Sequence, residues 1–186
     1  MHTEGRGPQR NLRFRWGFLV AFTPQNLARA RDIIARYPVA KSATLPLLHL
    51  AQDQDGWVSP QAMEEIGRLL DMTPAQVLGV CSFYTMYKRE PVGRLVVSVC
   101  TNVSCLVNGG PELLRALDEH HLGDDDVHVE EVECLAACDL APVMQVNYDF
   151  HGPMTPEAAE TVIDEYKRGV RAPRTVSGTR VEAKAR

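Results

Sequence analysis

The sequence has no apolar run long enough to cross a membrane as a helix. Such a helix needs roughly 18 consecutive apolar residues, whereas the nearest stretch, WGFLVAF at residues 16–22, is far shorter. This stretch follows an Arg-rich start, but no small-residue cleavage pattern comes after it, which does not fit a secretory signal. We therefore expect a soluble or peripheral protein in which residues 1–22 form an N-terminal extension or a transit peptide.

The central part of the chain also lacks an excess of basic residues. The whole chain holds 20 Lys and Arg against 24 Asp and Glu, for a net charge of -4. Four Arg lie in residues 1–15 and five Lys or Arg in residues 171–186, which leaves 11 basic and 22 acidic groups in residues 16–170. An acidic surface of this kind argues against nucleic acid as a partner. We predict that residues 171–186 form a basic C-terminal tail.

Cysteine is scarce, and its arrangement excludes several kinds of site. The chain has five cysteines, an odd number, and with no secretory signal this leaves a disulfide framework as a weak alternative. No C-x-x-C motif is present, so a thioredoxin-type redox dithiol is excluded. A Rieske-type site would need two histidines within the cysteine motifs. The candidate histidines lie outside both motifs and are expected at the surface: His120, His121, His128 and His151.

The first half of the chain is predicted to be helical. Thr23-Pro24, Ser59-Pro60 and Thr73-Pro74 each place a hydroxyl at a helix N-cap and proline at the first helical position. Apolar residues at helical spacing follow each of them, and a further helix at about 42–54 ends near Gly56. We therefore predict a helical bundle at residues 23–90.

No catalytic group of residues stands out in this helical half. Cys81 lies on an apolar helical face, which indicates a buried and inert thiol. The remaining polar candidates are interpreted as an isolated histidine and as carboxylates on solvated faces: His49, Asp53, Asp55, Glu64 and Glu65.

From about residue 91 the pattern changes to strands alternating with helices. Strands are predicted at 95–99, 127–133 and 143–147, with helices at 111–122 and from Thr155-Pro156 to about Gly169. The first strand is rich in β-branched residues, as expected for a strand covered on both faces. The order strand, helix, strand, strand, helix predicts an α+β or α/β domain at residues 91–170.

Four of the five cysteines form two pairs, each placed at the end of a predicted strand. Cys100 and Cys105 follow the first strand, and Cys134 and Cys138 follow the second. If these strands are parallel and joined by a right-handed crossover through 111–122, their carboxyl ends emerge at one edge of the sheet. We therefore predict one site made of four thiolates.

Four thiolates favour an iron–sulfur cluster or zinc over calcium or magnesium. Structural zinc sites usually use cysteine pairs in tight turns around a single ion. The longer C-x4-C spacing suits a wider two-iron cluster and is also the first spacing of plant-type ferredoxins, although the second pair does not follow that plant pattern. Spacing alone therefore favours iron–sulfur and leaves a zinc-stapled interaction module as an alternative.

The residues around the thiols are expected to tune such a cluster. The loops offer hydroxyl groups and small residues that leave backbone amides near the sulfurs: Thr101, Asn102, Ser104, Ala136 and Ala137. Acidic residues flank the second pair, and their charge opposes the addition of an electron: Glu130, Glu131, Glu133 and Asp139. A low reduction potential is therefore predicted, suited to one-electron exchange with a reduced flavin. No nucleophile with an identifiable base is present, so no general acid or base is expected.

The same motifs resemble a known family. CTNVSC, VECLAACDLAPVMQVN and the upstream stretch LPLLHLAQDQDGWVSPQAMEEIGRLLDMTPAQVLGVCSFYTMY resemble the [2Fe-2S] subunit of respiratory NADH:quinone oxidoreductase, or complex I, over about residues 25–170. The resemblance implies a thioredoxin-like [2Fe-2S] ferredoxin domain after the helical bundle. It also implies that Cys100, Cys105, Cys134 and Cys138 bind one [2Fe-2S] cluster.

The resemblance further implies where such a protein works. It implies a partner subunit that binds FMN and NADH, further peripheral-arm subunits, and a peripheral place on the cytoplasmic side of a bacterial inner membrane or the matrix side in mitochondria. NADH and FMN are not expected on this chain. Related subunits also serve NAD-linked hydrogenases and formate dehydrogenases, which is the second alternative. The sequence departs from the family at Ala136, where glycine is frequent, and this narrows the backbone conformations open to the second loop.

Overall fold

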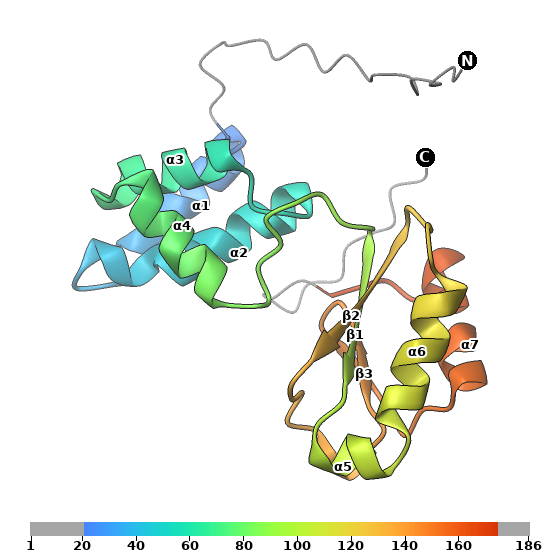
Figure 1. Cartoon of the computed structure of the whole chain (residues 1–186). Helices are drawn as coiled ribbons and strands as arrows, with labels where there is room; N and C mark the ends of the chain where they lie inside the picture. Colours follow the sequence, from blue (N-terminus) through green and yellow to red (C-terminus); the bar gives the residue numbers. More distant parts are fainter. Residues whose placement is uncertain (1–20, 175–186) are drawn as a thin grey trace, which may run out of the picture.

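The structure is a computed structural model that describes residues 21–174. Most of the predicted extension at residues 1–22 and of the predicted tail at 171–186 lies outside these residues. Figure 1 shows helices α1 to α4 on one side and a sheet with helices α5 to α7 on the other. None of the helices between residues 21 and 174 is both long and apolar enough to span a membrane.

The first helices begin where the sequence predicts. Their bounds are α1 Pro24–Ile34, α2 Thr44–Asp55, α3 Pro60–Leu70 and α4 Pro74–Phe83, with a 3-10 turn, η1, at Ala40–Ala43. The hydroxyls of Thr23, Ser59 and Thr73 each accept a hydrogen bond from a backbone N–H in the first helical turn. Gly56, with a φ of 80°, ends α2 in the left-handed conformation that glycine adopts without strain.

These four helices enclose an apolar core of their own. Its largest fully buried side chains are Phe22, Leu47, Leu48, Ile66 and Leu70. Cys81 is also fully buried in this core, and burial raises the pKa of its thiol. The interpretation of Cys81 as a buried and inert thiol therefore agrees with its environment.

Glu65 does not lie on a solvated face, and that prediction was wrong. Its side chain is on the inner face of α3, only 4% exposed, and its Oε2 accepts a hydrogen bond of 2.8 Å from the backbone N–H of Phe22. Phe22 enters the core just before α1, where its N–H has no helical partner. A buried carboxylate supplies that partner, because an unpaired buried N–H is costly.

The second region is built on a four-stranded mixed sheet with the strand order β2-β1-β3-β4. The bounds are β1 Leu95–Cys100, α5 Val103–Val107, α6 Gly110–His120, β2 Val127–Val132, η2 Cys138–Leu140, β3 Met144–Val146, β4 Asp149–His151 and α7 Pro156–Lys167. β1 and β2 are parallel, from Leu95 opposite Val127 to Cys100 opposite Val132. The predicted parallel pair is therefore present, joined through α6, while β3 pairs with β1 and with β4 in antiparallel fashion.

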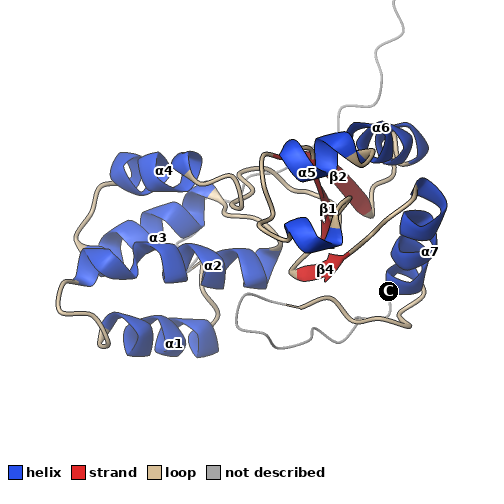
Figure 2. Ribbon diagram, turned by 90° about the horizontal axis from the view of Figure 1, so that it is seen from below, coloured by secondary structure: helices blue, strands red, loops and turns tan. Residues whose placement is uncertain are grey.

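Helices α6 and α7 lie side by side on one face of this sheet (Figures 1 and 2). Alternate residues of β1, namely Leu95, Val97 and Val99, share a fully buried core with Leu113, Leu117 and Ile163 of the helices. The intervening residues Val96, Ser98 and Cys100 therefore face the other side. The alternation thus fixes which face of the sheet carries the first thiol of the site.

Candidate metal centre

The first pair of thiols is buried at the carboxyl end of β1. Cys100 is the last residue of the strand and Cys105 lies in α5; they are 4% and 1% exposed. The short helix α5 is capped by Asn102, whose Oδ1 accepts a hydrogen bond of 2.6 Å from the N–H of Val103. The chain thus turns back within one helical turn, and this returns Cys105 to the side of Cys100.

The second pair lies on the loop after β2 and is exposed. Cys134 follows the strand and Cys138 begins the 3-10 turn η2. Between them Ala136 has a φ of 55°, the left-handed conformation that an L-residue with a Cβ rarely adopts. In this conformation its N–H points to Sγ of Cys134 at 3.3 Å. Alanine at position 136, where glycine is frequent in the family, therefore constrains the backbone of this loop.

The four cysteines lie around one cavity. Cys100, Cys105, Cys134 and Cys138 line a single cavity of about 170 Å³, closed on its inner side by Val143. No Asp, Glu or His is among the described residues that line the cavity, so the donors are the soft ligands that an iron–sulfur core requires.

A family comparison agrees with this geometry. The sequence model of the thioredoxin-like [2Fe-2S] ferredoxins matches residues 30–167. The chain belongs to this family. A [2Fe-2S] cluster is the cofactor of the family, which confirms the predicted cofactor and favours it over a zinc staple.

Relatives of this ferredoxin carry names from respiratory enzymes. An NADH-quinone oxidoreductase subunit of Mycobacterium tuberculosis is 42% identical over 158 residues, which cover 79% of this chain and 63% of that protein. The subunit of the same name in Rickettsia bellii is 38% identical over 157 residues, 79% of this chain and 94% of that protein. NADH dehydrogenase [ubiquinone] flavoprotein 2, mitochondrial, of Dictyostelium discoideum is 37% identical over 78% of this chain and 63% of that protein. The chain thus spans less than two thirds of the mycobacterial protein.

The fold is also found in a solved structure. An NAD+-reducing [NiFe]-hydrogenase chain aligns with a TM-score of 0.60 at 18% identity and covers 69% of this chain and 23% of its own length. At this identity the likeness concerns the fold alone. The family model, together with the observed mixed helices on a four-stranded sheet, confirms the predicted thioredoxin-like ferredoxin architecture.

Backbone amides of the ferredoxin loops stabilise the thiolate form of Cys100. Burial opposes its ionisation, but hydrogen bonds from the amides of Asn102 and Leu135 and from the thiols of Cys105 and Cys134 outweigh burial and lower its pKa. Burial raises the pKa of Cys105, against a hydrogen bond from the amide of Val143. Sequence reasoning expected amides near the sulfurs, but it missed Leu135 and Val143 as donors because neither residue type signals this role.

The hydroxyl of Thr101 does not donate a hydrogen bond to the thiols, although the sequence led us to expect this. It donates a hydrogen bond of 2.5 Å to Oε1 of Glu131. Asn102 uses its side chain to cap α5. Backbone amides, rather than these side chains, therefore supply the hydrogen bonds to Cys100 and Cys105.

The acidic residues near the site oppose the addition of an electron to a cluster less than their number suggests. Glu130 forms an ion pair with Nζ of Lys88 and accepts a hydrogen bond of 2.8 Å from Ser98. Its charge is therefore compensated within the fold, by a lysine far from it in sequence. Glu133 and Asp139 are exposed, so water and salt screen them.

Gly110 allows α6 to start directly against the first thiol loop. A Cβ at this position would lie 2.7 Å from the carbonyl oxygen of Cys100 and 2.9 Å from that of Cys105. Both distances are too short for real Cβ contacts, so only glycine fits. This requirement depends on the carbonyls of Cys100 and Cys105 and so could be seen only in the fold.

The histidines lie outside the thiol cavity, yet the prediction that all are surface residues was wrong for His121. Its side chain is 4% exposed and contacts the carboxylates of Asp124 and Glu160. His121 follows the last residue of α6, where α7 packs beside it and covers the ring. His120 is exposed, whereas His128 and His151 are partly buried.

Proposed function

We propose that this chain is the iron–sulfur electron-transfer subunit of the NADH dehydrogenase module of respiratory complex I. Cys100, Cys105, Cys134 and Cys138 would bind one [2Fe-2S] cluster. The observation that carries the proposal is the meeting of two thiol pairs, from the carboxyl ends of parallel neighbouring strands, around one cavity. The names of the relatives point to the same complex.

The bound cluster supplies a centre that accepts and releases one electron at a time. The chain's own residues hold and shield it. The amides of Asn102 and Leu135 donate to Cys100 and help to lower its pKa, and the amide of Val143 donates to Cys105 and opposes the rise of its pKa on burial. The inner side is packed with apolar residues that keep water away: Val132, Leu135, Ala137, Leu140, Ala141 and Val143.

The partner we propose is a flavin- and NADH-binding subunit of the same complex. The first thiol pair is buried and the second pair is exposed, so the outer edge of the site is the side that a partner can approach. FMN and NADH would then bind to the partner and not to this chain. Further peripheral-arm subunits would complete the assembly, placed peripherally on the cytoplasmic side of a bacterial inner membrane or on the matrix side in mitochondria.

The proposed domain organisation follows from the two separate apolar cores. Residues 23–90 would form a helical bundle and residues 91–170 the [2Fe-2S] domain, with residues 1–22 and 171–186 as extensions. Lys88, at the end of the helical part, pairs with Glu130 of β2. This ion pair supports a fixed joint between the two parts.

The test of the cluster is direct. Aerobically purified full-length chain should be red-brown, contain two irons and two sulfides, and bleach with dithionite. Cys100→Ser and Cys138→Ser should each lose iron, while Cys81→Ala, which removes the one thiol outside the cavity, should keep it. A colourless protein with one zinc would instead support the zinc-stapled interaction module.

The host complex needs a second experiment. An equivalent subunit in an NAD-linked hydrogenase or formate dehydrogenase would have the same site, and the fold is shared with an NAD+-reducing hydrogenase. Purification of the native complex through this chain, followed by identification of the other subunits, decides between them. A hydrogenase or formate dehydrogenase catalytic subunit among them would overturn the assignment to complex I and leave the cluster assignment intact.

A further inference from the structure

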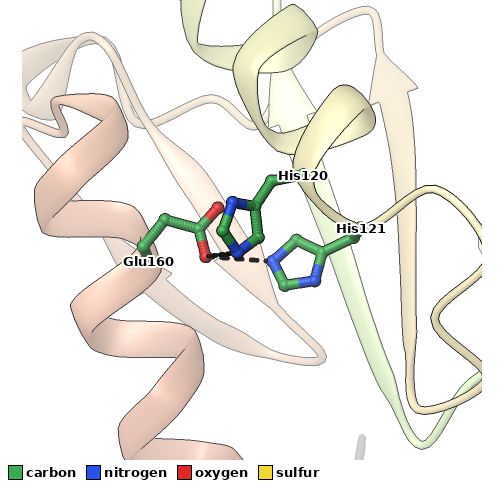
Figure 3. Close-up of side chains that lie close together, drawn as sticks. All are labelled: His120, His121 and Glu160. Carbon is green, nitrogen blue, oxygen red and sulfur yellow. Dashed lines mark hydrogen bonds and ion pairs between the residues drawn. The ribbon is translucent and has the colours of Figure 1, made fainter.

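Two histidines and a glutamate converge at a place remote from the thiols. His120 ends α6, His121 follows it, and Glu160 lies on α7; Figure 3 shows the three side chains pointing toward one another. One ligand atom from each lies within 4.8 Å of the others. We propose that this cluster, the α6–α7 histidine site, binds a divalent transition-metal ion of the zinc type.

The distances suit a shared ion. Nε2 of His121 lies 3.1 Å and Nε2 of His120 3.6 Å from Oε2 of Glu160. Ligands at about 2.1 Å from a tetrahedral zinc ion are about 3.4 Å from one another. These two separations bracket this value, and the histidine nitrogens lie within 4.8 Å of each other, so side-chain rotation would bring all three atoms to coordination distance. Two imidazole nitrogens with one carboxylate favour zinc-type ions over magnesium or calcium, which prefer oxygen ligands only.

The surroundings of His121 favour an ion at its Nε2. Both ring nitrogens face carboxylates: Nδ1 lies 3.2 Å from Asp124 and Nε2 lies 3.1 Å from Glu160. A neutral imidazole has one N–H and satisfies one of these contacts, so the other requires a proton or a metal ion. His120 turns its own Nε2 toward the same Glu160 oxygen, so an ion at this point would contact both histidines and the carboxylate.

Asp124 completes the support that metal-binding histidines normally have. When Nδ1–H of His121 donates to Asp124, Nε2 carries no proton and its lone pair can bind the ion. This is the usual carboxylate–histidine–metal arrangement. Asp124 is itself fixed by Nζ of Lys167 at 2.7 Å. The α6 C-terminus adds the negative end of the helix dipole, which favours a cation there.

The site is open on one side. The His120 side chain is 65% exposed, whereas those of His121 and Glu160 are 4% and 27% exposed. An ion can therefore enter along His120, and water can complete its coordination. Because the ligands come from α6 and α7, the bound ion would tie together the two helices that cover the sheet and would stabilise the fold by mass action.

The experiment uses the untagged, cluster-loaded full chain and Zn²⁺ alone. Equilibrium dialysis should give one zinc per chain with all iron retained. His120→Ala, which changes an exposed residue, should weaken zinc binding about tenfold or more, since even loss of a supporting residue costs about 10–100-fold. His128→Ala is the matched control, a partly exposed histidine elsewhere, and should bind zinc like the wild type.

A second readout separates this site from the thiols and from simple protonation. Cu²⁺ bound to the oxidised protein should show magnetic coupling to two nitrogens in the wild type and to one in His120→Ala. Three results would overturn the proposal: no saturable zinc uptake, equal uptake by His120→Ala, or zinc uptake accompanied by loss of iron. The first would leave His121 as a hydrogen-bonded residue between two carboxylates. The cluster assignment is measured separately, by iron content before zinc is added.

Discussion

Ala136→Gly should strengthen the hold of the second thiol loop on its cluster. Ala136 sits between Cys134 and Cys138 at a φ of 55°, a conformation that costs an L-residue about 1–2 kcal/mol and costs glycine almost nothing. The residue is exposed, so removal of its methyl group loses little buried area. The N–H that contacts Sγ of Cys134 at 3.3 Å remains in glycine.

The expected size of the effect follows from two opposing contributions. Relief of the left-handed conformation favours the closed loop by about 1–2 kcal/mol, while the extra freedom of glycine in the open loop disfavours it by about 0.4–1 kcal/mol. The balance is about 0.5–1 kcal/mol in favour of the closed loop. If cluster loss requires the loop to open, this corresponds to a rate of loss about two- to fivefold slower.

The assay follows bleaching of the visible absorption of the full chain in an excess of iron chelator at fixed temperature. Ala137→Gly is the matched control, because the neighbouring alanine has a φ of -116° and gains no relief. It should lose its cluster faster than the wild type by about two- to fivefold or more, through the entropy of glycine and the loss of a partly buried methyl group. Opposite signs at adjacent residues are therefore expected. If both variants change the rate in the same direction, the left-handed conformation of Ala136 does not govern loop opening.

Three further perturbations probe the surroundings of the site. Gly110→Ala should destabilise the fold by about 1–3 kcal/mol, because its Cβ would lie 2.7 Å from the carbonyl of Cys100; chemical unfolding and iron content measure this. Glu133→Gln with Asp139→Asn should raise the reduction potential, by on the order of 20 mV per charge at ~10 Å in water, as measured by voltammetry at low salt. A hydrogen bond from Lys167 and one from a backbone amide hold the pKa of Asp124 well below its usual range. Its ionised form therefore stabilises the fold above about pH 4 and loses this effect as the pH falls further, so Lys167→Met should show a shallower loss of stability in acid than the wild type.

Each of these has its own control. Gly79→Ala changes a helical glycine with nothing within 4 Å of the new Cβ and should stabilise the protein by about 0.5–1 kcal/mol. The potential shift should vanish at high salt, and an unchanged or lower potential at low salt would contradict the charge argument. Equal acid slopes for Lys167→Met and the wild type would show that Lys167 does not set the ionisation of Asp124.

The sequence was sufficient for features encoded in neighbouring residues. The hydroxyl-proline pairs located three helix starts of the first half and the start of α7, because a cap is a local interaction. The two cysteine pairs could be brought together in advance because parallel strands joined by a helix leave their carboxyl ends at one edge.

Features that depend on distant partners were not predictable in the same way. Strand β4 and helix α5 are three and five residues long, too short to show a period. Glu65 and His121 look like surface residues until Phe22 and α7 are placed over them. The ion pair of Glu130 with Lys88 joins residues 42 positions apart, so the compensated charge near the site could not be read from the acidic run alone.

The strand order has a consequence for the synthesis of the protein on the ribosome. β1 lies between β2 and β3, both of which follow it in the chain, and the N–H of Cys100 donates to Val143 just before β3. On the ribosome, the first two sulfurs therefore leave the exit tunnel well before the segments that will flank and cover them. The binding cage becomes whole only after about forty more residues have been added beyond Cys105. Metal loading must accordingly wait until the second thiol loop has emerged, and until then the first two thiols are exposed to oxidants.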